Sequence, residues 1–214
     1  MDNLDLDFLF ESHPDANLQL ADPYLLSYYK DLQRRTIFIT EEIGDNCYDL
    51  IKLILQWNYE DRGIEPQDRE TIRIIIASMG GSLESAESLC NIIELSETPI
   101  WTMGIGCVAS AASLIFLAGH KRFTYANSTF MFTDSIFQKP VEEENESTFY
   151  SKNMLLTTIQ ANIKTFLIEK TGITEAQYDK HCKNEWWFNT DDAFKLHICN
   201  EVSRSHYHYI KKDR

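Results

Sequence analysis

The sequence lacks paired cysteine spacings, an excess of basic residues and any long uninterrupted apolar run. Its cysteines are five in number, at positions 47, 90, 107, 182 and 199, and no two form a C-x-x-C pair. Its six histidines do not alternate with the cysteines as zinc ligands would. We therefore expect free and mostly buried thiols, no metal site and no other cofactor.

Basic residues are outnumbered by acidic ones, which leaves a net charge of −13 at pH 7. Non-specific binding to nucleic acid is excluded on this ground, because phosphate backbones attract lysine and arginine. The acid is concentrated at residues 142–146, which we interpret as a solvated segment. The main expected effect of the charge is solubility.

Membrane association is not expected. The longest apolar stretch, residues 107–119, is too short and too interrupted by small residues to cross a bilayer. Residues 1–7 are acidic where a secretory signal would be basic, so we expect a cytoplasmic location. No internal repeat or low-complexity tract is present.

The 214 residues, 43% apolar and 25% charged, suit one globular domain with a sizeable core. We predict strands at 36–40, 71–77, 99–103, 122–125 and 129–133, and helices at 46–59, 83–96, 110–119, 148–170, from 174 onward, and 191–196. This alternation implies right-handed βαβ units and an α/β fold. The strand at 71–77 is nearly continuously apolar and is expected to be buried on both faces. Residues 1–34 are interpreted as an acidic arm and lead-in, and residues 204–214 as a polar tail.

Two strand-to-helix junctions, at residues 78–82 and 104–110, carry glycines. Such junctions gather at the carboxyl ends of parallel strands, where ligand crevices form. Gly80 and Gly81 can bring backbone N–H groups close to a substrate, as an oxyanion hole requires, and Ser110 stands at a helix start. A simple turn and a helix N-cap explain the same residues, so the spacing alone leaves both roles open.

From about residue 35 to 202 the chain resembles ClpP, the serine peptidase subunit of ATP-dependent Clp proteases. Residues 78–82 are similar to the family's Ser-Pro-Gly-Gly segment, and residues 106–111 to its Gly-x-Ala-Ala-Ser-Met nucleophile helix. Residues 121–123 and 126–128 match its Lys-Arg-Phe and Pro-Asn-Ser, and residues 171–172 and 191–193 keep the same register. The resemblance implies the ClpP/crotonase-like superhelical fold over residues 35–203, with a protruding handle helix at about 140–170.

The resemblance also assigns catalytic positions. Ser110 takes the nucleophile position, and Gly81 and Ala111 supply the oxyanion-hole N–H groups. The family's Met-Ile-His-Gln-Pro corresponds to residues 131–135, so Thr133 stands where the histidine base belongs, and Glu185 replaces the aspartate. A carboxylate of either length can orient an imidazole, but a threonine hydroxyl cannot accept a proton near neutral pH. Loss of such a base costs on the order of 10⁶-fold in turnover.

Another histidine could replace the missing base, and His181 is the candidate, because it precedes Glu185 by four residues. Asp134 should point to the opposite face of its strand. His120 lies beyond the far end of the Ser110 helix, about 15 Å away. Nothing places the histidines at positions 13, 197, 206 and 208 near the site.

We therefore expect an inactive pseudo-peptidase subunit. Two alternatives remain open: an active serine endopeptidase with a rearranged triad of Ser110, His181 and Glu185, and an acyl-thioester binder of the crotonase superfold. The acyl-thioester binder would need only paired backbone N–H groups that polarise a carbonyl, and no nucleophile.

The same resemblance also implies how the subunit assembles with other subunits. It implies homo-oligomeric rings, heptamers or tetradecamers, or a mixed ring with active ClpP subunits. The helix at 148–170 would join rings or pack on its own domain through an apolar face made of Leu156, Ile159, Ile163, Phe166 and Leu167. Residues 186–188 suit a core or subunit contact.

The docking of an AAA+ unfoldase is left open. The family's docking pocket is rich in aromatic residues, and its positions align here with Arg73, Ile75 and Leu95. These positions hold one charge and two aliphatic side chains.

Overall fold

The computed structural model describes residues 22–133 and 146–203. One sheet has the strand order β1-β2-β3-β4-β7, and β5 pairs with both β3 and β6. Every pairing is parallel except the antiparallel pair of β5 and β6. The strands are β1 Thr36–Ile39, β2 Ile72–Ser78, β3 Ile100–Ala109, β4 Lys121–Tyr125, β5 Thr129–Phe132, β6 Trp186–Asn189 and β7 Glu201–Ser203. The predicted α/β fold with a largely parallel sheet is confirmed.

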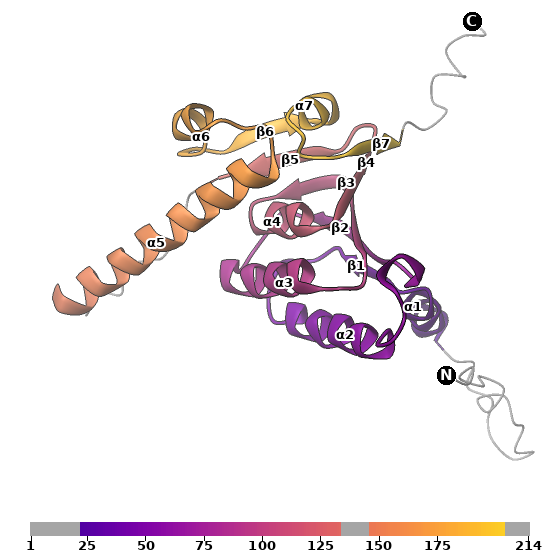
Figure 1. The fold of residues 1–214 in the computed structure, drawn as a ribbon. Helices are drawn as coiled ribbons and strands as arrows, with labels where there is room; N and C mark the ends of the chain where they lie inside the picture. The colour runs from indigo at the N-terminus through magenta and orange to yellow at the C-terminus, as the bar shows by residue number, and fades with distance from the viewer. Residues whose placement is uncertain (1–21, 134–145, 204–214) are drawn as a thin grey trace, which may run out of the picture.

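The helices pack mainly on one side of this sheet. They are α1 Pro23–Gln33, α2 Asn46–Glu60, α3 Leu83–Leu95, α4 Ala111–Ala118, α5 Glu146–Lys170, α6 Glu175–His181 and α7 Thr190–Lys195. Figure 1 shows α2, α3 and α4 together on one face, and α5 projecting from the body as a long arm, as the predicted handle helix requires. None of the described helices has both the length and the apolar character needed to cross a membrane.

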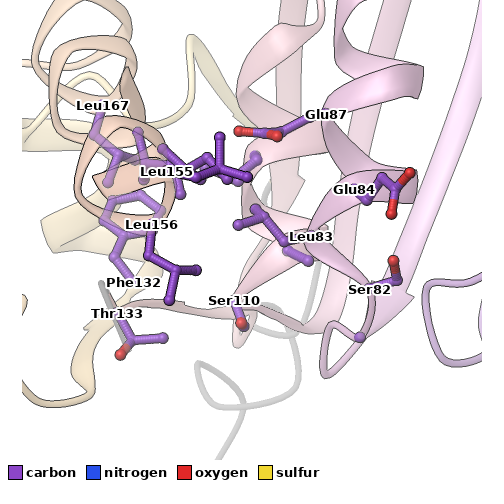
Figure 2. A pocket seen from close by; sticks show the side chains of 15 residues that line it. Ser82, Leu83, Glu84, Glu87, Ser110, Phe132, Thr133, Leu155, Leu156 and Leu167 are labelled. Carbon is purple, nitrogen blue, oxygen red and sulfur yellow. The ribbon is translucent and has the colours of Figure 1, made fainter. Parts of the chain in front are cut away.

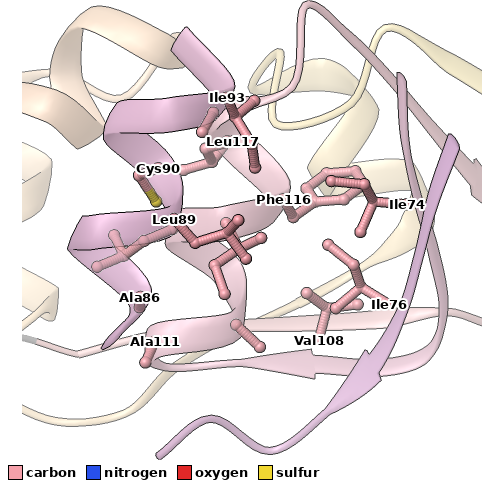
Figure 3. Close-up of a cluster of buried hydrophobic side chains, with 14 of the residues drawn as sticks. Ile74, Ile76, Ala86, Leu89, Cys90, Ile93, Val108, Ala111, Phe116 and Leu117 are labelled. Carbon is pink, nitrogen blue, oxygen red and sulfur yellow. The ribbon is translucent and has the colours of Figure 1, made fainter. Parts of the chain in front are cut away.

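The core lies between this helix layer and the sheet (Figure 3). Ile74 and Ile76 of β2 are fully buried against Leu89 of α3 and Phe116 of α4. The rings of Phe116 and Phe130 lie 5.0 Å apart, which ties α4 to β5. Alternate strand residues point toward the helices, and each large apolar side chain buried there contributes about 1.5–3 kcal/mol.

The opposite sheet face carries no covering helix layer among the described residues, and we call it the open sheet face. The burial of β2 alternates strictly between buried and half-buried residues, so the prediction that this strand is buried on both faces is wrong. The open sheet face presents Phe38, which is 50% exposed, with half-buried Ile75, Trp101 and Phe123 beside it. Parallel sheets are normally covered on both faces, so this face is unusual for an isolated chain.

Several elements differ from the predicted ones. β3 runs on to Ala109, because it changes partner from β4 to β5 and turns at Gly106, whose φ is 61°. Helix α1 and strands β6 and β7 were not expected from the sequence pattern. The capping box predicted at Thr174 is confirmed, since its hydroxyl and the Gln177 side chain form both reciprocal bonds. The tail at 204–214, most of the acidic segment at 142–146 and the first part of the predicted handle lie outside the described residues.

A buried ion pair joins β1 to α2. The two terminal nitrogens of Arg35 donate to the two carboxylate oxygens of Asp61 at 2.6 and 2.8 Å. The hydroxyl of Thr98 donates to the same carboxylate at 2.7 Å, and Asp61 is only 2% exposed. The hydrogen bonds from Arg35 hold the pKa of Asp61 below its ordinary value. This carboxylate therefore links three segments that are distant in the sequence.

Candidate active site

Ser110 lies in a strained turn between β3 and α4. Its φ is 52° and its ψ is −126°, a region that residues with a side chain rarely adopt. The backbone is held on both sides, because its N–H donates to Met131 O at 2.9 Å and its carbonyl accepts from Ser113 N at 2.9 Å. Ser110 occupies the N-cap position of α4, yet its hydroxyl makes no capping hydrogen bond. The strain therefore serves no capping role, and strain of this kind collects at functional sites.

The loop at Gly80 and Gly81 lies directly against this serine. Gly80 has φ 106°, and a Cβ there would come within 2.8 Å of the Ser110 Cβ and 3.1 Å of the Ala111 nitrogen. Gly81 has φ 147°, and a Cβ there would overlap the backbone carbonyl of Ile43. Ile43 N donates to Gly80 O at 2.8 Å, which fixes the loop. Only glycine permits this approach at either position.

A pocket of about 710 Å³ opens at this junction (Figure 2). Helix α3 forms one wall and helix α5 the other, and Ser110 lies between them near Thr133 and Phe132. The lining residues are Gly81, Ser82, Leu83, Glu84, Glu87, Ser110, Ala111, Leu114, Phe132, Thr133, Leu155, Leu156, Ile159, Ile163 and Leu167. The fold therefore brings together Ser110, Thr133, Gly81 and Ala111, four of the residues singled out from the sequence.

Glu185 does not line this pocket. Its carboxylate is exposed and accepts a hydrogen bond from the Trp187 indole at 3.0 Å. In the antiparallel pair, Phe132 of β5 stands opposite Trp186 of β6. Thr133 directly follows Phe132 and Glu185 directly precedes Trp186, so the two residues lie at the same end of the β5–β6 pair.

His181 is not among the residues that line the pocket. Its ring stacks on the Trp186 ring, with centroids 4.6 Å apart and 25° between the planes. Trp186 pairs with Phe132 and therefore shares its face of the β5–β6 pair, whereas Glu185 and Trp187 point to the other face. Neither His181 nor any other histidine of the described residues lines the pocket with Ser110.

His120 also lies apart from the pocket. The Nδ1 atom of His120 accepts a hydrogen bond from Ile100 N at 3.0 Å, at the far end of α4. Asp134 and the histidines at positions 13, 206 and 208 lie outside the described residues.

Two glutamates on α3 were not identified from the sequence as site residues. Glu84 and Glu87 both line the pocket, three positions apart and therefore on one helix face. Glu84 is exposed, whereas Glu87 is half-buried and burial raises the pKa of its carboxyl. The sequence could have indicated them, because both lie within the first two turns after Gly81, in a helix that begins at the candidate site.

The cysteines and the predicted docking positions lie away from the pocket. Four cysteines, at positions 47, 90, 182 and 199, are buried, and no group of three potential metal ligands occurs in the described ranges. Arg73 donates to Arg34 O at 3.1 Å, Ile75 lies on the open sheet face, and Leu95 is 78% exposed at the end of α3. The sequence leaves unfoldase docking at these three positions open, and nothing in the described residues tests it.

The chain is similar to known proteins in both sequence and fold. The family model described as Clp protease matches residues 22–206. The ATP-dependent Clp protease proteolytic subunit 2 of Treponema denticola is 28% identical over 203 residues, which cover 94% of this chain and 96% of that protein. Subunit 3 of Frankia casuarinae is 29% identical over 184 residues, covering 83% and 81%. A solved structure of a ClpP1 variant from Listeria monocytogenes shares the fold, with a TM-score of 0.68 at 24% identity, covering 84% of this chain and 96% of that one.

Proposed function

The chain belongs to the Clp protease family, and from that premise we propose that it is a pseudo-peptidase subunit whose serine site lacks its base. The observation that carries this proposal is the pocket itself. Ser110 and Thr133 line it together, and within residues 22–133 and 146–203 no histidine lines it. Without a base Ser110 remains a weak nucleophile near neutral pH. The N–H groups of Gly81 and Ala111 would still polarise a bound carbonyl, so we propose peptide binding without ordinary cleavage.

A fluorophosphonate probe tests the state of the serine. We expect the wild-type protein to react no faster than its Ser110→Ala variant, because no base withdraws the hydroxyl proton. The measurement is the rate of covalent mass gain by intact-protein mass spectrometry. Ser82→Ala is a matched control, since Ser82 lines the same pocket and its hydroxyl caps α3. Rapid labelling that Ser110→Ala abolishes would contradict the proposal and favour an active peptidase.

We also propose that the subunit assembles with copies of itself, or with active ClpP subunits, into rings of the heptamer or tetradecamer type. The relatives are named as proteolytic subunits. The open sheet face leaves Phe38 50% exposed on a sheet type that is normally covered. On α5, Ile163 and Leu167 are buried against the chain's own domain, whereas Met154 is 75% exposed. The first surface is proposed to contact the neighbour within a ring, and the projecting half of α5 to contact a second ring.

Native mass measurement separates these two contacts. Phe38→Asp is expected to reduce the assembly to monomers, because a charge on the open sheet face would be desolvated in the contact. Met154→Asp is expected to halve the native mass by separating stacked rings. Tyr59→Asp is the matched control, since Tyr59 is 62% exposed on α2 and belongs to neither surface. A wild-type protein that is monomeric at all concentrations would refute the assembly proposal.

A further inference from the structure

The cleft between α3 and α5 extends beyond the pocket at Ser110. A second cavity of about 300 Å³ follows it and shares Glu87, Leu114 and Ile163 with the first. One wall of the combined groove is polar and acidic, with Glu84, Glu87, Asn91 and Glu94 contributed by α3. The facing wall, on α5, is largely apolar and comprises Leu155, Leu156, Ile159, Ile163, Phe166 and Leu167, with Asn162.

Glu87 stands where the two cavities meet. It is half-buried, and among the described residues no side chain donates a hydrogen bond to it or forms an ion pair with it. Glu94, further along the groove, is already paired with Lys170. Figure 2 shows the Glu87 carboxylate pointing across the groove toward α5, whereas that of Glu84 points away from it.

An unpaired carboxylate in such a position is unfavourable. Removing it from water without a partner costs free energy, and burial raises the pKa of Glu87 for this reason. A cation placed in the groove would restore the missing partner and favour the ionised form. The leucines of the facing wall suit an alkyl stem, since lysine and arginine bury their methylene groups while the charge meets a polar partner.

We propose that this groove selects a peptide segment with a lysine or arginine side chain, whose cationic group pairs with Glu87 while its alkyl stem packs on α5. This inference rests on the proposed function only in taking the pocket as a peptide-binding site. A purely apolar side chain would desolvate Glu87 further, and an acidic one would be repelled. A divalent cation does not fit, because no group of three potential metal ligands occurs among the described residues.

The test compares three hexapeptides that differ only at one central position, which holds lysine, its neutral analogue norleucine, or glutamate. Each carries a neutral coumarin label, and binding to the full-length Ser110→Ala protein is measured by fluorescence anisotropy at physiological salt, which screens long-range charge. The lysine peptide is expected to bind about tenfold more tightly than the norleucine peptide, because a hydrogen bond to a charged group is worth at least that. The glutamate peptide should bind most weakly.

Glu87→Gln is expected to bring the lysine and norleucine affinities within about twofold of each other, since it removes the charge but keeps the shape. Glu169→Gln makes the same charge change on α5, and should leave the tenfold ratio intact because Glu169 is exposed and lines neither cavity. Equal affinities in the Glu87 protein, a ratio that survives Glu87→Gln, or no binding of any peptide would overturn the inference. Fluorophosphonate labelling of Ser110 would refute the pseudo-peptidase proposal without changing this ratio, so the two failures are distinguishable.

Discussion

Replacing Thr133 with histidine is expected to increase the rate of fluorophosphonate reaction at Ser110 by about 10³-fold or more. Position 133 lines the same pocket as Ser110, and the strained Ser110 backbone and the Gly80–Gly81 loop are already in place. Glu185 directly precedes the residue that pairs with Phe132, so it lies at the same end of the β5–β6 pair as position 133, and we expect its carboxylate to accept a hydrogen bond from the new imidazole. The substitution would then supply the base whose absence at position 133 the proposed function rests on.

The measurement combines labelling rate with cleavage of a fluorogenic peptide. Thr133→Ala is the matched control, because it changes the same position without supplying a base. Adding Ser110→Ala to Thr133→His should abolish the gain. If Thr133→His folds normally but labels no faster than Thr133→Ala, the site does not have the geometry of a triad, and the proposal that only its base is missing is wrong.

The hydrogen bond between the Trp187 indole and the Glu185 carboxylate suggests a second substitution to combine with Thr133→His. Trp187→Phe in the Thr133→His background should raise the rate further, by about tenfold, since it frees the carboxylate to orient the imidazole. The same substitution in the wild-type background should change nothing, because no imidazole is present at position 133. An equal gain in both backgrounds would contradict the role proposed for Glu185.

Asp61→Asn is expected to destabilise the folded chain by about 3–5 kcal/mol, because it removes the bidentate partner of the largely buried Arg35 guanidinium and leaves it only Glu60, at 4.0 Å, as an ion-pair partner. The Asp61 side chain is 3% exposed and that of Arg35 is 12% exposed, so water cannot replace the lost partner. Thermal and urea unfolding measure the change. Asp49→Asn is the control, since Asp49 pairs with Lys52 where both side chains are 76% exposed, and its loss should cost less than about 1 kcal/mol.

The same pair predicts how stability depends on pH. Asp61 has a lower pKa in the folded chain than in the unfolded chain, where it is about 3.9. Its contribution is therefore fully present above the unfolded pKa and is lost as the pH falls through the folded pKa. The stability difference between the wild type and Asp61→Asn should accordingly shrink below about pH 4. A difference that stays constant from pH 6 down to acid unfolding would contradict this assignment.

Much of the fold followed from local sequence patterns. The apolar strands, the periodic helices and the capping box at Thr174 depend on neighbouring residues, so their order along the chain was predictable and is confirmed. The elements that were missed, α1, β6 and β7, are short or lack strong periodicity. β3 was predicted too short, because its last residues pair with β5 rather than with the strand that holds its first part.

The candidate site also has features that the sequence predicts and features that only the structure shows. The glycine junctions, Ser110 and the threonine at position 133 can be read directly from the chain, because motif identity is a property of adjacent residues. Three facts could not be read in this way: His181 stacks on Trp186, the Glu87 carboxylate faces the groove with no side-chain partner among the described residues, and the described helices cover β2 on one side only. Each depends on which distant segments pack together, and therefore on strand register and helix placement, which no local pattern encodes.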